Sequence, residues 1–403
     1  MYHSLINEVY ISMIFKKPYC HYGTVFAVAL LMIEIFYPAL SRVVSEFGIS
    51  IQSSQWLVTI FLGAAMVAEF IMPMMLTVMS PKRIHQNVWF IGLSANVLSL
   101  IVSTYDQLFF ARLLLGLSAG GLIILMRIQI EFSEKNITKG FNYAVSAMLG
   151  FHAIMLVITP TISAYVVTLF DWRAIHWIAI AGFLWIRPIF NDWPDQIILM
   201  NWDWKTYTKS IHDILCYPNQ LKQIVLAGFM SSISMCEVIF SMYYLINHFH
   251  WTILNVGLYL SVVKLMDIFI RVLLPYRLHD GNVQMIINIC LNIFVCAMLT
   301  LTHALYLNSI FSYLIGCIMI NAVCNALLTV FSINIFLEVA KKVPITGNAL
   351  LGSLQFGSCF IASAILNMLI TFNLVGFILY MSLCIVLIVY LLAPKYRFSL
   401  IFA

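Results

Sequence analysis

Four carboxylates stand inside long apolar stretches of this sequence and could do chemistry there: Glu34, Glu69, Glu237 and Asp267. An ionised carboxylate in hydrocarbon costs several kcal/mol, so each should face a cavity, find a partner or take up a proton. A carboxyl group that alternates between these conditions can load and release a proton. All four are therefore candidates for proton exchange, and the alternative for each is a structural acid bonded to a neighbouring helix.

Glu34 has the strongest pattern of the four. It follows the uncharged run "TVFAVALLMI" and precedes Pro38 by four residues. A helix rises about 1.5 Å per residue, so Glu34 lies about 16 Å from the start of this run, near the middle of a bilayer. Arg112 interrupts another apolar run, and a buried guanidinium needs a carboxylate or backbone carbonyls. Glu34 is a candidate partner for Arg112, either in proton coupling or as a fixed ion pair that orders helices.

The second part of the chain also carries charged residues inside apolar runs. Glu237 stands alone in "SISMCEVIFSMYY". Lys264, Asp267 and Arg271 are spaced by three and four residues, which places them on one helix face. A local salt-bridge ladder is the main interpretation, and coupling to substrate or proton is the alternative. We expect Glu34, Glu237 and Asp267, with the aromatic residues Tyr37 and Tyr243, to line a substrate cavity.

The composition requires a membrane protein. Of 403 residues, 63% are hydrophobic and 9% are charged, with a mean hydropathy of +0.98. Soluble domains carry roughly 25% charged residues. The sequence has no basic stripe for nucleic acid and no phosphate-binding GxxxxGK[ST] motif. Its nine cysteines include no CxxC pair, so we expect no disulfide set, no metal site and no cofactor.

Twelve apolar runs are long enough to cross a bilayer, at about 20 residues each. The sequence therefore predicts an all-α integral membrane fold of twelve transmembrane helices in two six-helix halves. We expect an N-terminal half at 1–190, a cytoplasmic central linker at 191–221 and a C-terminal half at 222–403. The first run contains Glu34 and lacks a small-residue cleavage site, so we interpret it as an uncleaved span rather than a signal peptide. The runs are approximately 23–43, 54–79, 87–104, 107–129, 141–168, 173–190, 222–247, 252–274, 283–303, 307–337, 346–370 and 373–393.

The basic residues of the connecting segments predict the orientation. With the N-terminus inside, only Arg42 and Arg173 fall in outer loops. The positive-inside rule then places both termini in the cytoplasm. The inner segments hold Lys16, Lys17, Lys82, Arg83, Lys135, Lys139, Lys205, Lys209, Lys222, Arg277, Lys341, Lys342, Lys395 and Arg397.

A short repeat supports two related halves. The pattern P-x-R-[IL]-H occurs at 81–85, after the second run, and again at 275–279, after the eighth. Parallel six-helix repeats are one way in which secondary transporters are built. We expect Lys82, Arg83 and Arg277 of these two loops to act in gating.

Several motifs together resemble the major facilitator superfamily, and within it the drug:proton antiporters of the Bcr/CflA-like type. Glu34 and the following Pro38-Ala39-Leu40 are similar to the acidic residue and Pro-Ala-Leu of the family's first helix. The segments "ARLLLGLSAGG", "DWRAIHW" and "TGNALLGSLQFGS" resemble its fourth, fifth and eleventh helices. The gating loop departs from the family pattern, with Pro73 for a glycine and Thr77 for an aspartate. The fifth-helix antiporter pattern keeps its proline but carries Thr159 and Ser163-Ala164 in place of glycines.

The resemblance implies a monomer in the bacterial inner membrane that is not an enzyme. It would exchange protons for drug-like or amphipathic small molecules by alternating access, with Glu34, Arg112 and Glu69 in proton coupling. The weakened fifth-helix pattern leaves open a proton symporter for metabolite uptake. The altered gating loop leaves open a non-transporting membrane protein or sensor.

Overall fold

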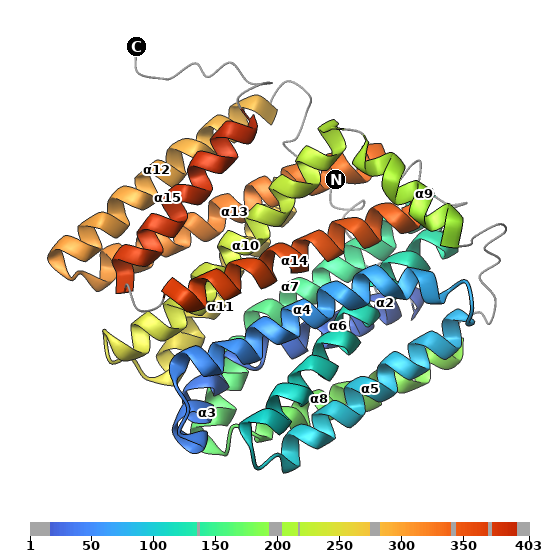
Figure 1. The fold of residues 1–403 in the computed structure, drawn as a ribbon, viewed down its shortest axis with the longest axis horizontal. Coiled ribbons are helices and arrows are strands. Elements are labelled where there is room, and N and C mark those ends of the chain that lie inside the picture. Colours follow the sequence, from blue (N-terminus) through green and yellow to red (C-terminus); the bar gives the residue numbers. More distant parts are fainter. Residues whose placement is uncertain are drawn as a thin grey trace, which may run out of the picture.

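The computed structural model describes residues 17–134, 138–192, 204–216, 218–274, 283–339, 344–369 and 373–392. Every regular element in these ranges is a helix, and no strand occurs among them. The helices run side by side in one bundle (Figure 1). The predicted all-α fold is confirmed.

The helices follow the twelve predicted runs in order. We call the elements from α2 to η2 the first half and those from α10 to α15 the second half. The first half contains α2 (Lys17–Glu34), η1 (Tyr37–Ala39), α3 (Leu40–Phe47), α4 (Ile51–Met75), α5 (Pro81–Ile101), α6 (Tyr105–Glu134), α7 (Thr138–Leu169), α8 (Ala174–Ile186) and η2 (Arg187–Asp192). After α9 (Trp204–Leu215), the second half contains α10 (Pro218–Asn247), α11 (Ile253–Leu273), α12 (Val283–Leu307), α13 (Ile310–Val339), α14 (Pro344–Leu369) and α15 (Asn373–Leu392).

Nine spans in the described part of the chain are long and apolar enough to cross a membrane. The first combines α2, η1 and α3 over His21–Phe47, and two further apolar stretches, Ala153–Leu169 and Ala174–Ile189, are shorter. The remaining predicted span, α5, begins with Pro81-Lys82-Arg83, which lowers its apolar character. The count of twelve is therefore an approximate description of the membrane-spanning part.

Two helix pairs join the halves along their length. α4 packs against α14, and α7 packs against α11. In Figure 1, α12 and α15 form one edge of the bundle and α5 and α8 the opposite edge. Small residues allow the close approaches: a Cβ atom on Gly257 of α11 would overlap Ala164 of α7. Within the first half, Gly116 and Gly120 of α6 lie against the backbone of α4, as the GxxxG spacing predicts.

Helix α9 lies across the end of this bundle. It packs against α14 and α10, and the Tyr207 hydroxyl donates a 3.0 Å hydrogen bond to the carbonyl oxygen of Phe70 in α4. Burial raises the pKa of the Tyr207 hydroxyl above its usual range, so it stays a donor at any physiological pH. The linker helix therefore contacts both halves at once.

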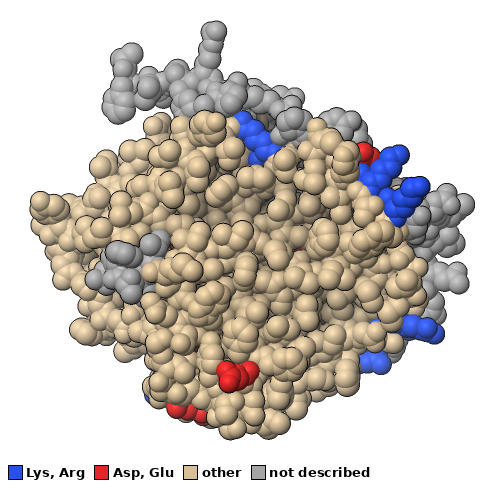
Figure 2. Space-filling view, viewed as in Figure 1, with Lys and Arg blue, Asp and Glu red and all other residues tan. Residues whose placement is uncertain are grey.

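Charged side chains avoid the middle of the bundle surface. On the face in Figure 2, most Lys and Arg gather toward the end that carries α9, with one acidic group among them; the other acidic groups lie in the lower part, and the broad centre is uncharged. We call the end that carries α9 the inner end. The opposite end, with residues 48–50 and 248–252, is called the outer end, after the predicted orientation.

Candidate functional site

A proline breaks the first span directly after Glu34. α2 ends at Glu34, and Pro38 lies in the short helix η1 that follows. The amide of Ala39 bonds to Phe36 instead of continuing the α-helical pattern, which frees the carbonyl of Ile35. The Ser163 hydroxyl of α7 donates a hydrogen bond to that carbonyl. Ser163 therefore repairs the break and fixes α7 against the segment that carries Glu34.

Glu34 pairs with a lysine from the other half. Its Oε1 atom lies 3.7 Å from Nζ of Lys264 in α11, and each side chain is 10% exposed. The second carboxylate oxygen, Oε2, is buried without a hydrogen-bond partner. This ion pair thus connects the two halves, and on the first-half side it lies at the middle of the span His21–Phe47.

Of the two alternatives for Arg112, a carboxylate or backbone carbonyls, the structure shows the carbonyls. It donates to the carbonyl oxygens of Leu57 at 3.2 Å and Met32 at 3.3 Å. Its guanidinium lies 4.1 Å from the ring centre of Phe36 and 4.4 Å from that of Phe61. Carbonyls and aromatic faces are the alternative way to hold a buried cation. Arg112 does not form an ion pair with Glu34 in this structure and instead joins α6 to α2 and α4.

Glu69 forms an ion pair inside the first half. Its Oε2 atom lies 3.2 Å from Nη1 of Arg127 in α6, while Oε1 has no hydrogen-bond partner. The pair packs closely against the second half: a Cβ atom on Gly352 of α14 would overlap both Glu69 and Arg127. These residues lie toward the inner end, so the Glu69–Arg127 pair is part of the contact that closes the halves there.

Glu237 is fully buried among neutral donors. Ser241 donates to Oε1 at 2.7 Å and Tyr259 of α11 at 3.1 Å, and Asn321 of α13 donates to Oε2. Tyr313 supports Ser241 through a hydrogen bond of 2.9 Å. Three helices of the second half therefore converge on this one carboxylate.

A pair of asparagines links Glu237 to the second buried acid of this half. Asn325, one turn from Asn321 on α13, donates to Asp267 Oδ1 at 2.6 Å and to Asn321 Oδ1 at 3.0 Å. The charge of Lys264 also acts on Glu237. Asp267, Asn325, Asn321 and Glu237 thus form a polar path inside the second half, and the Glu34–Lys264 pair is a separate link between the halves. The predicted ladder of Lys264, Asp267 and Arg271 is not described in full, since the side chain of Arg271 lies outside the described residues.

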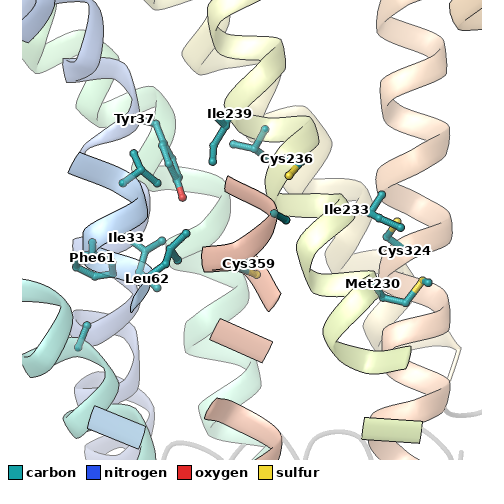
Figure 3. Close-up of a cluster of buried hydrophobic side chains, with 14 of the residues drawn as sticks. Ile33, Tyr37, Phe61, Leu62, Met230, Ile233, Cys236, Ile239, Cys324 and Cys359 are labelled. Carbon is teal, nitrogen blue, oxygen red and sulfur yellow. The ribbon is translucent and has the colours of Figure 1, made fainter. Parts of the chain in front are cut away.

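Apolar side chains surround this polar path. Figure 3 shows Ile33 and Tyr37 of the first span, Leu62 of α4, Cys359 of α14 and Ile239 of α10 within one cluster of buried hydrophobic side chains. The Tyr37 hydroxyl donates to the sulfur of Met235 at 3.1 Å, across the boundary between the halves. The site is closed to water in this conformation, as the small exposure of Glu34 and Lys264 also indicates.

The remaining predicted residues lie away from this centre. Tyr243 lines a cavity at the outer end rather than the space beside Glu34. Lys82 and Arg83 occupy the first turn of α5, with Arg83 exposed, and Arg277 lies outside the described residues. Trp172 and Arg173, from the fifth-helix motif, both bond Glu46 and so clamp α3 to the start of α8.

Sequence reasoning missed Arg127, Asn321 and Asn325 as members of the site. Arg127 interrupts the apolar run "LIILMRIQI", the same signal that identified Arg112. The two asparagines stand four residues apart in "IMINAVCNAL", a spacing that places both on one face of a helix. Lys264 was noted, but for a local ladder rather than for a contact with the first half.

The comparison with known families decides the identity of the fold. The profile of the Major Facilitator Superfamily matches residues 23–363. The chain belongs to the Major Facilitator Superfamily. It is an integral membrane protein with the transporter fold, and this membership supports transport of a small molecule and makes an enzymatic role unexpected.

Solved structures agree with that fold. A D-xylose-proton symporter superposes with a TM-score of 0.70 at 13% identity, over 95% of this chain and 97% of that one. The nucleoside transporter NupG, as a mutant, gives 0.68 at 12% over 93% and 100%, respectively. A bacterial homologue of the human lysosomal transporter Spinster, in an inward-facing and unoccupied conformation, gives 0.67 at 11% over 94% and 96%. Such identities show the fold alone. No curated protein sequence matches the chain at a significant level.

Proposed function

We propose that this protein is a proton-coupled secondary transporter that works by alternating access, with Glu34 as its proton site. The observation that carries the proposal is the Glu34–Lys264 ion pair, which joins the first half to the second and leaves one oxygen of Glu34 unbonded. A proton on that carboxylate removes its charge and ends its attraction to Lys264. Proton binding thereby acts directly on a contact between the two parts that must move.

The size of this effect is adequate for coupling. Two unit charges about 4 Å apart attract each other by about 4 kcal/mol at an effective dielectric constant of 20. A change of that size shifts the ratio of two conformations by roughly a thousandfold. The cost of removing both charges from water reduces the net stabilisation, so only part of this attraction contributes to the difference between the two conformations. Even a third of it changes the ratio about tenfold.

Export of amphipathic, drug-like molecules in exchange for protons is the direction that we infer. The first span keeps an acid four residues before Pro-Ala-Leu, as in the antiporters that the sequence resembles. The buried side chains drawn in Figure 3 near the break in this span, including Ile33, Leu62 and the ring of Tyr37, are apolar or aromatic and suit contact with a lipophilic body. In this mechanism a proton from outside neutralises Glu34 as the substrate leaves outward. Loss of the proton to the inside then resets the pair with Lys264.

Uptake of a polar metabolite by proton symport is the second candidate. The network around Glu237, Asn321 and Asn325 offers the neutral donors and acceptors that a hydroxylated substrate needs. The structural neighbours include a sugar-proton symporter and a nucleoside transporter, although the low identities carry no substrate assignment. Counterflow in vesicles with the proton gradient reversed separates export from uptake.

The decisive experiment measures dye efflux from cells at two external pH values. We expect the native chain to expel a lipophilic dye faster at the lower external pH. Glu34→Gln should lose that pH dependence and at least about 90% of the rate, because an amide can neither take up a proton nor attract Lys264 as a charge. Asp106→Asn, at an exposed acid of the outer end, is the matched control and should transport normally.

A Glu34→Gln variant that keeps full, pH-dependent efflux would remove Glu34 from proton coupling. If no dye, drug or polar metabolite changes its accumulation when the native chain is over-expressed, the chain does not transport these classes. That result would favour the non-transporting scaffold or sensor.

A further inference from the structure

A separate cavity opens at the outer end, between the two halves. Its volume is about 120 Å³. The first half contributes α3 and the start of α4, and the second half contributes the end of α10. None of its lining residues belongs to the Glu34–Lys264 pair or to the network around Glu237. The lining residues are Leu40, Ser41, Val44, Ile51, Ser54, Gln55, Ile239, Met242, Tyr243, Ile246 and Asn247.

Two buried polar atoms on side chains of this cavity, one on Gln55 and one on Ser41, have no hydrogen-bond partner in the described part of the protein. Gln55 is 3% exposed, and its Oε1 atom makes no hydrogen bond. The Ser41 hydroxyl, across the cavity on α3, is likewise buried and unbonded. A buried acceptor without a donor costs about 1–3 kcal/mol. A molecule in the cavity that donates a hydrogen bond to Gln55 would remove this cost.

The rest of the lining determines the charge and shape of that molecule. No acidic or basic side chain lines the cavity, so nothing there compensates a charged group. Ile239, Met242 and Ile246 of α10 form an apolar wall opposite Leu40 and Val44. For scale, an apolar cavity of about 150 Å³ accommodates benzene. The cavity therefore fits a small neutral body of roughly that size, and its opening to the surface lets a larger molecule extend outward.

An inner floor separates this cavity from the proposed proton site. Tyr37 lies one turn before Ser41, and Met235 lies one turn before Ile239, so their hydrogen bond is one layer further into the bundle. Figure 3 shows Tyr37 beside Ile239 at this level. A ligand in the outer cavity would rest above this layer, out of contact with Glu34.

We propose that the outer cavity is a binding site for a small neutral molecule with an apolar body and a hydrogen-bond donor directed to Gln55. Bound there, the molecule contacts α3 and α4 on one side and α10 on the other. It therefore stabilises the arrangement in which the outer ends of the two halves lie together. This site does not depend on the chain transporting anything, so it can be tested separately from the proposed function.

The test uses a cysteine as a reporter in the full chain, reconstituted in lipid nanodiscs. Ser41→Cys places a buried thiol at the wall of the cavity, and a small water-soluble methanethiosulfonate reagent, in excess over long incubation, modifies it when it enters the cavity. The unsubstituted chain gives the background from native thiols. Ser45→Cys, on the exposed side of the same helix, is the matched control. The probes are benzyl alcohol, toluene, benzoate and benzylammonium, which share a ring and differ in donor and charge.

We expect benzyl alcohol to slow the modification of Ser41→Cys about tenfold at ten times its Kd, since about nine-tenths of the sites are then occupied. Toluene and the two ions should protect much less at equal concentration. Gln55→Leu in the Ser41→Cys background should abolish the preference for benzyl alcohol over toluene. Ser45→Cys should react at the same rate with every probe.

Equal protection by toluene and benzyl alcohol, or a preference that survives Gln55→Leu, would show unspecific apolar partitioning and overturn the proposal. No protection by any probe would mean that water alone fills the cavity, with the same consequence. If Gln55→Leu does not fold, Val44→Phe serves instead, because its ring fills the space from a half-buried position. Protection by benzyl alcohol must then fall. Loss of dye efflux in Glu34→Gln with protection intact would separate this site from the proton site.

Discussion

The two halves hold their buried charges in different ways. In the first half, Glu69 is held by the cation of Arg127, and Arg112 by backbone carbonyls and aromatic rings. In the second half, the side-chain hydrogen bonds to Glu237 come from hydroxyl and amide donors that carry no charge. The Glu34–Lys264 pair crosses between these two environments.

This difference separates a carboxylate whose protonation would leave a buried cation unpaired from a carboxylate that could be protonated without that cost. If Glu69 took up a proton, the charge of Arg127 would remain in the protein without compensation. If Glu237 took up a proton, its hydroxyl and amide neighbours would carry no unbalanced charge and could reorient. Apart from Glu34, the first half therefore holds its buried charges as fixed contacts that define its packing, whereas the surroundings of Glu237 in the second half tolerate protonation. This distinction yields three predictions about stability.

Arg127→Met should have the largest effect, because it leaves the carboxylate of Glu69 buried and unpaired. We expect a loss of about 3–5 kcal/mol in the free energy of unfolding, measured by denaturant titration in detergent micelles. The double variant Glu69→Met/Arg127→Met should recover most of that loss, since both charges are removed together. Arg83→Met, at an exposed base near the inner end, is the control and should stay within about 0.5 kcal/mol of the native chain. A double variant as unstable as Arg127→Met would show that the pair is not what the first half requires.

Glu237 tests the second half by the same measurement. Glu237→Leu leaves the donors of Ser241, Tyr259 and Asn321 without their acceptor, and each unpaired donor costs about 1–3 kcal/mol. We expect a total loss of at least about 2 kcal/mol. Glu237→Gln keeps the shape and one acceptor oxygen and should lose less than half as much. If the two variants are equally unstable, Glu237 needs its charge, and the contrast between the halves is wrong.

The sequence located the charged residues of the first span but not all of their partners. Glu34 is identifiable from the sequence because both signals that mark it, the apolar run before it and Pro38 after it, lie beside it in the chain. Its partner Lys264 was assigned to a ladder with Asp267, since spacing along one helix reveals local pairs only. Which face of α11 meets α2 depends on how α7 and α11 pack, and the small residues Ala164 and Gly257 determine that approach. For a similar reason the sequence leaves open whether Arg112 pairs with Glu34 or with backbone carbonyls, and the structure shows the carbonyls of Met32 and Leu57.

The order and type of the helices were easier to predict than the hydrogen-bond partners in the polar interior. Apolar runs fix the order and type of the helices because every span must bury its backbone polar groups within itself. Hydrogen-bond partners such as Asn321 and Asn325 leave no comparable trace, since an isolated asparagine barely changes a hydropathy average. The available signal is the spacing of four residues between two asparagines in an apolar run. This spacing indicates a polar helix face, but it does not identify the residues that this face contacts.

The smallest predicted loss in the free energy of unfolding concerns the linker helix α9, which contacts both halves. Tyr207→Phe removes the hydrogen bond from α9 to the carbonyl of Phe70, next to Glu69 in α4. We expect a loss of about 0.5–1.5 kcal/mol in the free energy of unfolding, the usual contribution of one hydrogen bond. Tyr390→Phe, at an exposed tyrosine of α15, is the control and should have no measurable effect. Because Tyr207 anchors α9 to the first half while α9 also packs on α10 and α14, the bond holds the inner ends of both halves together. Combined with Arg127→Met, the loss should fall short of the sum of the single losses if the linker and the Glu69–Arg127 pair close the same contact, because opening that contact already removes both interactions. Simple additivity would show that α9 stabilises the fold independently of that pair.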